Sequence, residues 1–128
     1  MQLQEVAQTM VRARKPWNYT GIMLVAGETY DLAATGCWTD LVIPHGPAGD
    51  PSNSAYMRLF ERWRRVPSAN WFTLIGALDA QVPSAFVIGA HCLYTPDRSG
   101  QLTCFANDVS GFYWNNFGAV RLKVTRVA

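Results

Sequence analysis

The stretch Ala-Val-Arg-Leu-Lys-Val-Thr-Arg-Val, residues 119–127, points most directly to the fold class of this chain. Its aliphatic residues Val120, Leu122 and Val124 alternate with polar and basic ones. A period of two places the aliphatic side chains on one face of a strand and the charged side chains on the other. A strand that buries one face and wets the other is typical of antiparallel sheets, so this stretch predicts such a strand.

Further strand-like segments lie along the chain, each rich in Val, Ile, Leu, Phe or Tyr and each ending near Gly, Pro, Asp or Asn. They are residues 20–25, 29–35, 72–78, 85–93 and 102–107. Turn-forming residues separate them at hairpin-like spacing. Because the chain shows neither an internal repeat nor a linker, we expect one domain over residues 1–128, an all-β jelly-roll sandwich with one short helical insertion.

The helical insertion is expected between residues 54 and 65. Apolar side chains recur there at helical intervals, and they are Tyr56, Leu59, Phe60 and Trp63. The segment also carries four arginines, Arg58, Arg62, Arg64 and Arg65. We expect these arginines to form a solvated helix face, with a contact patch as the alternative.

Composition excludes several classes of protein. The 128 residues carry a net charge of +2, from 11 basic and 9 acidic residues, which is too even for nucleic-acid binding driven by phosphate neutralisation. No apolar run is long enough to span a membrane, and residues 1–15 lack the apolar block of a signal peptide. We therefore expect a cytoplasmic protein without membrane insertion, with release from the cell left open. The three cysteines lack CxxC spacing and are expected to be buried free thiols.

The densest polar cluster is Asn-Asp-Val-Ser-Gly-Phe-Tyr-Trp-Asn-Asn, residues 107–116. Asp108 offers a carboxylate, Asn115 and Asn116 offer amide oxygens, and Gly111 permits a tight reversal that could aim a backbone carbonyl inward. Calcium binds oxygens of these kinds, so the loop is a candidate calcium site, although its residue order is not that of an EF-hand. The alternative is that these residues are turn formers that cap their own backbone.

Three rings, Phe112, Tyr113 and Trp114, lie inside this polar loop. Exposed rings beside oxygen donors suit a sugar, whose C–H face is apolar and whose edge carries hydroxyls. The alternative is ordinary core filling, because aromatic rings bury large areas wherever they can.

A second loop, residues 44–53, is rich in turn-forming residues and is expected at the surface. His45 in this loop could be a metal ligand or a base, but it is separated from every cysteine and His91 lies in an apolar strand run, so we expect a buried or merely polar role. A Cys–His hydrolase built from a cysteine with His45 or His91 ranks below binding, because no nucleophile signature such as G-x-S-x-G is present. No phosphate loop or dinucleotide fingerprint is present either.

Three stretches carry a resemblance to a known family. They are Thr-Gly-Ile at 20–22 with Gly-Glu at 27–28 and Ala-Ala-Thr-Gly at 33–36, then Gly-Pro-Ala-Gly-Asp at 46–50, then Asn-Asp-Val-Ser-Gly at 107–111 followed by Tyr113 and Asn115-Asn116. In this order the chain resembles the PA-I type of bacterial galactophilic lectins. The resemblance implies a small calcium-dependent jelly roll with a galactose-binding-domain-like fold that assembles as a homo-oligomer, a dimer or a tetramer.

The resemblance also implies the binding residues. Calcium would be held by side-chain oxygens and by two backbone carbonyls, and these ligands would come from Asp108, Asn115, Asn116, Phe112 and either Asp40 or Thr39. Two sugar hydroxyls would complete the metal shell. The expected sugar contacts are Asp108, Val109, Asn115, Asp40, Asn53 and His45, with Asn53 standing where the family has a histidine that reaches the outer hydroxymethyl group.

We therefore expect a calcium-dependent lectin without catalysis, which binds terminal galactose or a related sugar on galactose-type glycans. Each site would be weak, and affinity would come from several sites presented together. The alternative is a protein-interaction sandwich without metal, whose contact surface would be the arginines of the helical stretch and the exposed aromatic rings.

Overall fold

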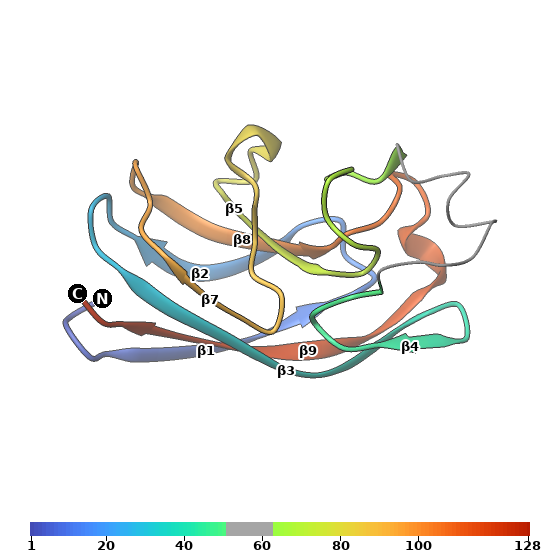
Figure 1. Cartoon of the computed structure of the whole chain (residues 1–128), viewed down its shortest axis with the longest axis horizontal. Helices are drawn as coiled ribbons and strands as arrows, with labels where there is room; N and C mark the ends of the chain where they lie inside the picture. The colour runs from blue at the N-terminus through green and yellow to red at the C-terminus, as the bar shows by residue number, and fades with distance from the viewer. Residues whose placement is uncertain (51–62) are drawn as a thin grey trace.

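The computed structural model describes residues 1–50 and 63–128, and these residues form two antiparallel β-sheets that face each other (Figure 1). Within them, the first sheet contains β1 (Val6–Arg12), β9 (Asn116–Arg126), β3 (Tyr30–Asp40), β4 (Ile43–His45) and β7 (His91–Tyr94). The second sheet contains β2 (Asn18–Leu24), β8 (Gly100–Ala106), β5 (Leu74–Leu78) and β6 (Phe86–Val87). Two 3₁₀ helices are also described, η2 (Val82–Ser84) and η3 (Tyr113–Asn115). The predicted β-sandwich is confirmed.

The pairing of β3 with β9 fixes the backbone at the end of the sandwich where the 107–116 loop enters β9. Each strand has 11 residues, and the pairing ends with Asp40 opposite Asn116. The aliphatic side chains at 120, 122 and 124 are buried while the basic side chains between them are exposed, so the alternation predicted for residues 119–127 is confirmed. A shift by one residue would expose this whole apolar face, so burial fixes the register and keeps Asp40 across from Asn116.

Trp38 and Phe72 close the core at the same end of the sandwich. Trp38 is fully buried, and its ring meets that of Phe72 edge-on with centroids 6.1 Å apart. The Trp38 Nε1–H donates to the Phe72 carbonyl at 3.1 Å, and the Phe72 N–H donates to the Asn107 carbonyl at 2.8 Å. The start of the 107–116 loop is therefore anchored to the core.

The structure differs from the predicted strands in three places. β1 and β4 are strands that the sequence did not predict. The single strand expected over residues 85–93 is wrong, because the chain leaves the second sheet after β6 and enters the first sheet at β7. Gly89 lies between them with a φ of 61°, a conformation that glycine adopts without strain. This glycine permits the sharp turn that divides the apolar run.

The helix expected between residues 54 and 65 lies outside the described residues except for its last three positions. In the described part of the chain, no helix has the length and apolar character needed to cross a membrane.

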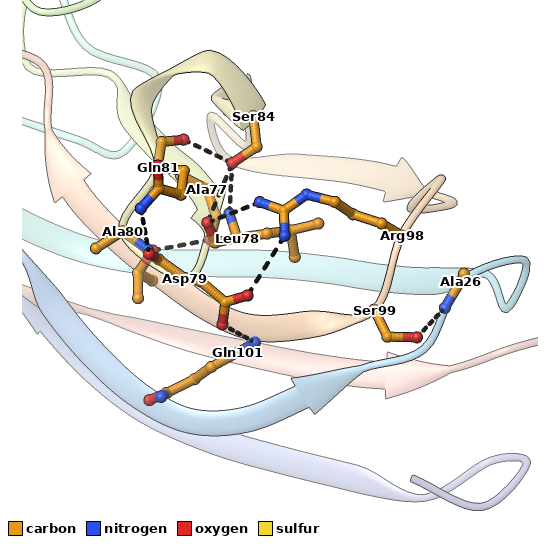
Figure 2. Close-up of polar contacts among 11 residues, drawn as sticks. Ala26, Ala77, Leu78, Asp79, Ala80, Gln81, Ser84, Arg98, Ser99 and Gln101 are labelled. Carbon is orange, nitrogen blue, oxygen red and sulfur yellow. Dashed lines mark hydrogen bonds and ion pairs between the residues drawn. The ribbon is translucent and has the colours of Figure 1, made fainter.

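A polar network closes the end of the sandwich opposite the 107–116 loop (Figure 2). Asp79 and Ala80 both adopt positive φ angles, 51° and 55°. Asp79 Oδ1 accepts the Gln101 N–H at 2.8 Å, and Arg98 lies 3.4 Å from Asp79 Oδ2 (Figure 2). The Ala80 N–H donates to the Thr103 hydroxyl at 3.0 Å. These bonds offset the strain of two adjacent left-handed residues, so we assign the network a structural role.

Gly49 is expected to be far less tolerant of alanine than Gly27. Both have positive φ, 75° and 82°, so each alanine would add about 1 kcal/mol of backbone strain. A Cβ on Gly49 would also meet the backbone carbonyl of Trp71 and lie 2.5 Å from Thr73 Oγ1, whereas a Cβ on Gly27 would meet nothing within 4 Å. Overpacking adds about 1–3 kcal/mol. Urea unfolding should show a loss of about 2–4 kcal/mol for Gly49→Ala against about 1 kcal/mol for Gly27→Ala. Equal losses would contradict this packing.

Candidate functional site

The loop between β8 and β9 meets the β3–β4 turn at one end of the sandwich, on the right in Figure 1. The register places Asp40 opposite Asn116, and the Leu41 N–H donates to the Asn115 carbonyl at 2.8 Å. On the other side, Val109 forms a β-bridge with Arg64. Segments far apart in the sequence therefore hold the loop from both sides.

Asp108 carries the charge of this site. It is 4% exposed, its Oδ1 accepts the Val109 N–H at 2.7 Å, and its Oδ2 accepts a hydrogen bond from Asn116 Nδ2 at 3.1 Å. Burial raises the pKa of Asp108 to about 6, against the lowering effect of these two hydrogen bonds, and the charge of Asp40 raises it further. No cationic side chain within residues 1–50 and 63–128 forms an ion pair with this carboxylate. A positive charge bound there would stabilise its ionised form.

Two buried amide oxygens beside Asp108 lack hydrogen-bond donors. In the part of the chain that the structure describes, Asn115 Oδ1 and Asn116 Oδ1 are both buried without a partner. The orientation of Asn116 is fixed, because its Nδ2 donates to the Ala13 carbonyl and to Asp108 Oδ2, each at 3.1 Å. An unsatisfied buried acceptor destabilises the fold by about 1–3 kcal/mol, so a cation or a donor from outside the described residues would stabilise these oxygens.

The remaining oxygen donors expected from the sequence are near this group. Asp40 is half-buried at the end of β3; burial raises the pKa of its carboxyl, and the charge of His45 lowers it. Thr39 lies opposite Phe117 in the β3–β9 pair. Among the described residues, no three His, Cys, Asp or Glu side chains form a metal-ligating group, so a cation here would depend on amide and backbone oxygens. Such donors fit a hard cation such as calcium.

His45 is buried, which confirms the buried role expected for it, although the loop that contains it was expected at the surface. It lies in β4 opposite Trp38 and is 7% exposed, with its ring 5.1 Å from that of Phe72. His45 Nδ1 lies 3.8 Å from a carboxylate oxygen of Asp50, and within the described residues its Nε2 has no hydrogen-bond partner. Pairing with β3 buries this residue, and a sugar contact by His45 stays a prediction. Asn53 lies outside the described residues.

The three rings of the loop separate into two kinds. Tyr113 is buried, and its hydroxyl donates to the Ala106 carbonyl at 2.6 Å. Phe112 and Trp114 are 45% and 64% exposed. Core filling is therefore correct for Tyr113, while two rings remain exposed near the oxygen donors.

Asn107 has a role that the sequence did not predict. It is fully buried; its Oδ1 accepts the Val66 N–H at 3.0 Å, and its Nδ2 donates to the carbonyls of Val66, Ala69 and Asn70. These bonds fix residues 66–70 rather than the backbone of Asn107 itself. Local sequence carries no signal for so distant a set of partners.

The solvated position expected for the arginines is wrong for Arg64 and Arg65. Arg64 is 8% exposed, donates to the Pro67 carbonyl at 2.6 Å and lies 5.1 Å from the centre of the Trp71 ring. Arg65 is half-buried against aromatic rings. Contact with aromatic rings stabilises a guanidinium that is removed from water. Arg58 and Arg62 lie outside the described residues.

The two cysteines that are at least partly buried, Cys92 and Cys104, are not activated nucleophiles. Cys104 is buried as expected, Cys92 is half-buried, and the buried position expected for Cys37 is wrong because it lies on the exposed face of β3. Burial raises the pKa of the Cys92 thiol to about 11 and that of Cys104 further. Neither thiol is therefore a thiolate at neutral pH. His91 Nε2 lies 3.0 Å from Asp31 Oδ1, so this histidine pairs with a carboxylate.

Asp108 is expected to make the metal-free protein less stable as pH rises. Its folded pKa of about 6 is above the ordinary value of 3.8, so folding favours the protonated form. The contribution is therefore most favourable below about pH 4 and is lost as pH rises through about 6, a loss of about 3 kcal/mol at 1.36 kcal/mol per pH unit. Urea unfolding of the wild type and of Asp108→Asn between pH 4.5 and 8, with chelator, measures the difference. Parallel profiles for the two proteins would contradict this assignment.

The fold of this chain is an antiparallel β-sandwich. A similar solved structure is the EclA N-terminal domain, described as a PllA-like lectin, which is 21% identical, with a TM-score of 0.68 over 93% of this chain and 94% of that chain. No protein-family model matches this chain, and no curated protein sequence matches it either. At this identity the likeness establishes the fold alone.

Proposed function

We propose that this chain is a calcium-dependent lectin that binds terminal galactose or a related sugar at the 107–116 loop, without catalysis. The observation that carries the proposal is the pair of buried amide oxygens, Asn115 Oδ1 and Asn116 Oδ1, left without donors beside the buried carboxylate of Asp108. Within the described residues no donor reaches the two amide oxygens and no cationic side chain forms an ion pair with the carboxylate, and a hard cation would interact favourably with all three groups.

The donor set favours calcium over softer metals. Carboxylate, amide and carbonyl oxygens suit calcium, which takes six to eight of them in a flexible arrangement. In this proposal the side chains of Asp108, Asn115 and Asn116 hold the ion, together with the carbonyl of Phe112 and one from Asp40 or Thr39. The ion would supply positive charge to the buried carboxylate and open coordination positions for hydroxyl groups.

Sugar hydroxyls fit the open side of such a site. Asp108 would accept hydrogen bonds from hydroxyls that also contact the ion, and the amide of Asn115 would form hydrogen bonds with the same hydroxyls. Bonds to the charged carboxylate offset the loss of water. Val109 would add backbone and apolar contact, with Asp40, His45 and Asn53 as further candidate contacts. The exposed rings of the loop suit the apolar face of a sugar. The lectin fold of the neighbouring structure is consistent with carbohydrate binding.

Binding to immobilised galactose tests the proposal. We expect retention in calcium and release by chelator, because the hydroxyls would bind through the ion. A glycan array with and without calcium should show signal on galactose-type glycans only when calcium is present. Oligomers of at least two copies would strengthen retention by presenting several sites together. Retention that chelator does not change would contradict the calcium-dependent reading, and a protein that takes up no calcium would favour the interaction-module alternative.

A further inference from the structure

Arg65 lies directly behind the candidate site and contacts both halves of its loop. Its backbone N–H donates to the carbonyl of Asp108 at 3.0 Å. Its guanidinium donates to the Tyr113 hydroxyl at 3.0 Å and also to the Pro16 carbonyl. One residue therefore joins the N-terminal segment, the Asp108 end of the loop and the η3 end of the loop.

Three rings fix the Arg65 side chain in this place. The guanidinium carbon lies 3.6 Å from the centre of the Phe105 ring, 4.5 Å from that of Trp17 and 5.5 Å from that of Tyr113. Phe105 is fully buried on the outer side of β8, where it packs with Trp17 and other apolar side chains. A guanidinium held by ring faces and by two hydrogen bonds has little freedom to move.

The contact with Tyr113 links Arg65 to the candidate ligands. Phe112 precedes Tyr113, and Asn115 and Asn116 follow it, so three of the candidate ligands lie within three residues of this ring. The Tyr113 hydroxyl donates to the Ala106 carbonyl at 2.6 Å while it accepts from Arg65, so both of its hydrogen-bonding roles are used. The remaining side-chain ligand, Asp108, is held through its own backbone carbonyl by Arg65.

We propose that Arg65 is a positioning residue that fixes the spacing between Asp108 and the amide oxygens of Asn115 and Asn116. This inference rests on the proposed function. Arg65 carries a positive charge that would repel the calcium ion, so it would favour calcium binding only by holding the ligands in place and not by direct attraction. Residues that orient metal ligands without touching the metal typically change metal affinity by about 10–100-fold when they are replaced.

Calcium titration of Arg65→Met by calorimetry tests the inference, at a temperature well below the unfolding midpoint of each protein. Methionine keeps an unbranched side chain and removes the guanidinium donors to Tyr113 and Pro16, while the backbone N–H that donates to the Asp108 carbonyl remains. We expect a calcium Kd weaker by about 10–100-fold. Tyr113→Phe keeps the ring and removes the hydroxyl that Arg65 contacts. It should therefore also weaken the calcium Kd, but by less than Arg65→Met does. If Arg65→Met does not fold, an unchanged calcium Kd for Tyr113→Phe overturns the inference.

Arg126→Met is the matched control. Arg126 Nε lies 3.2 Å from Glu28 Oε2, and its NH1 donates to the Met1 carbonyl at 3.2 Å, at the other end of the sandwich. Its replacement should lower the unfolding midpoint and leave the calcium Kd unchanged. A folded Arg65→Met that binds calcium as tightly as the wild type would overturn the inference and leave the proposed function intact. A wild type that takes up no calcium would overturn the proposed function and this inference with it.

Discussion

Asp108→Ala is expected to abolish calcium-dependent sugar binding. The substitution removes the buried charge of the site and leaves only amide and backbone oxygens beside Asp40, and the affinity of calcium sites depends strongly on the number of charged ligands. We expect the calcium Kd to weaken by about two orders of magnitude or more, with loss of retention on galactose. Calorimetric titration with calcium, then with galactose in excess calcium, measures both effects.

Asp31→Asn is the matched control for this prediction. Asp31 is a carboxylate of β3 that pairs with His91 on the exposed face of the first sheet, away from the 107–116 loop. Its replacement should leave both titrations unchanged. Undiminished calcium binding by Asp108→Ala would contradict the ligand set proposed for this loop.

Asn107→Ala is expected to be among the most destabilising single changes in the chain. It would leave the Val66 N–H and the Ala69 carbonyl without the side chain that now satisfies them, and the carbonyls of Val66 and Asn70 would keep only their backbone donors. Each unsatisfied buried group destabilises by about 1–3 kcal/mol, and water can reach some of these groups, so we expect a total loss of about 3–5 kcal/mol. Urea unfolding with chelator present measures this loss in the free energy of unfolding.

Asn70→Ala provides the comparison, because the Asn70 side chain is exposed and only its backbone carbonyl meets Asn107. This substitution should lower the free energy of unfolding by no more than about 0.5 kcal/mol, as ordinary surface substitutions do. Asn107→Ala should also weaken calcium binding, because residues 66–70 directly follow the proposed positioning residue Arg65. A loss below about 1 kcal/mol for Asn107→Ala would show that residues 66–70 do not depend on this side chain.

The sequence predicted the strands whose patterns are strong and missed those whose patterns depend on partners. Alternation of buried and exposed positions in residues 119–127 was sufficient to predict β9. β1 has one buried position among seven, because it is an edge strand, and its pairing with β9 is what makes it a strand. β4 has three residues with a proline at its centre and forms only against the end of β3.

The site was predictable where its chemistry is local. Asp108, Asn115 and Asn116 lie within nine residues of one another, so their oxygen donors could be recognised together from the sequence. The burial of Arg65 could not, because helical spacing indicated a solvated face and only the distant rings make burial favourable. The orientation that keeps two amide oxygens away from every donor of residues 1–50 and 63–128 is likewise visible only in three dimensions.

A crystal structure of the protein with calcium and galactose tests the central claim most directly. We expect a calcium ion within about 2.3–2.6 Å of Asn115 Oδ1, Asn116 Oδ1 and the Asp108 carboxylate, with two galactose hydroxyls in its remaining positions. A structure grown in excess calcium in which these two amide oxygens instead accept hydrogen bonds from protein or water, with no ion between them, would contradict the claim.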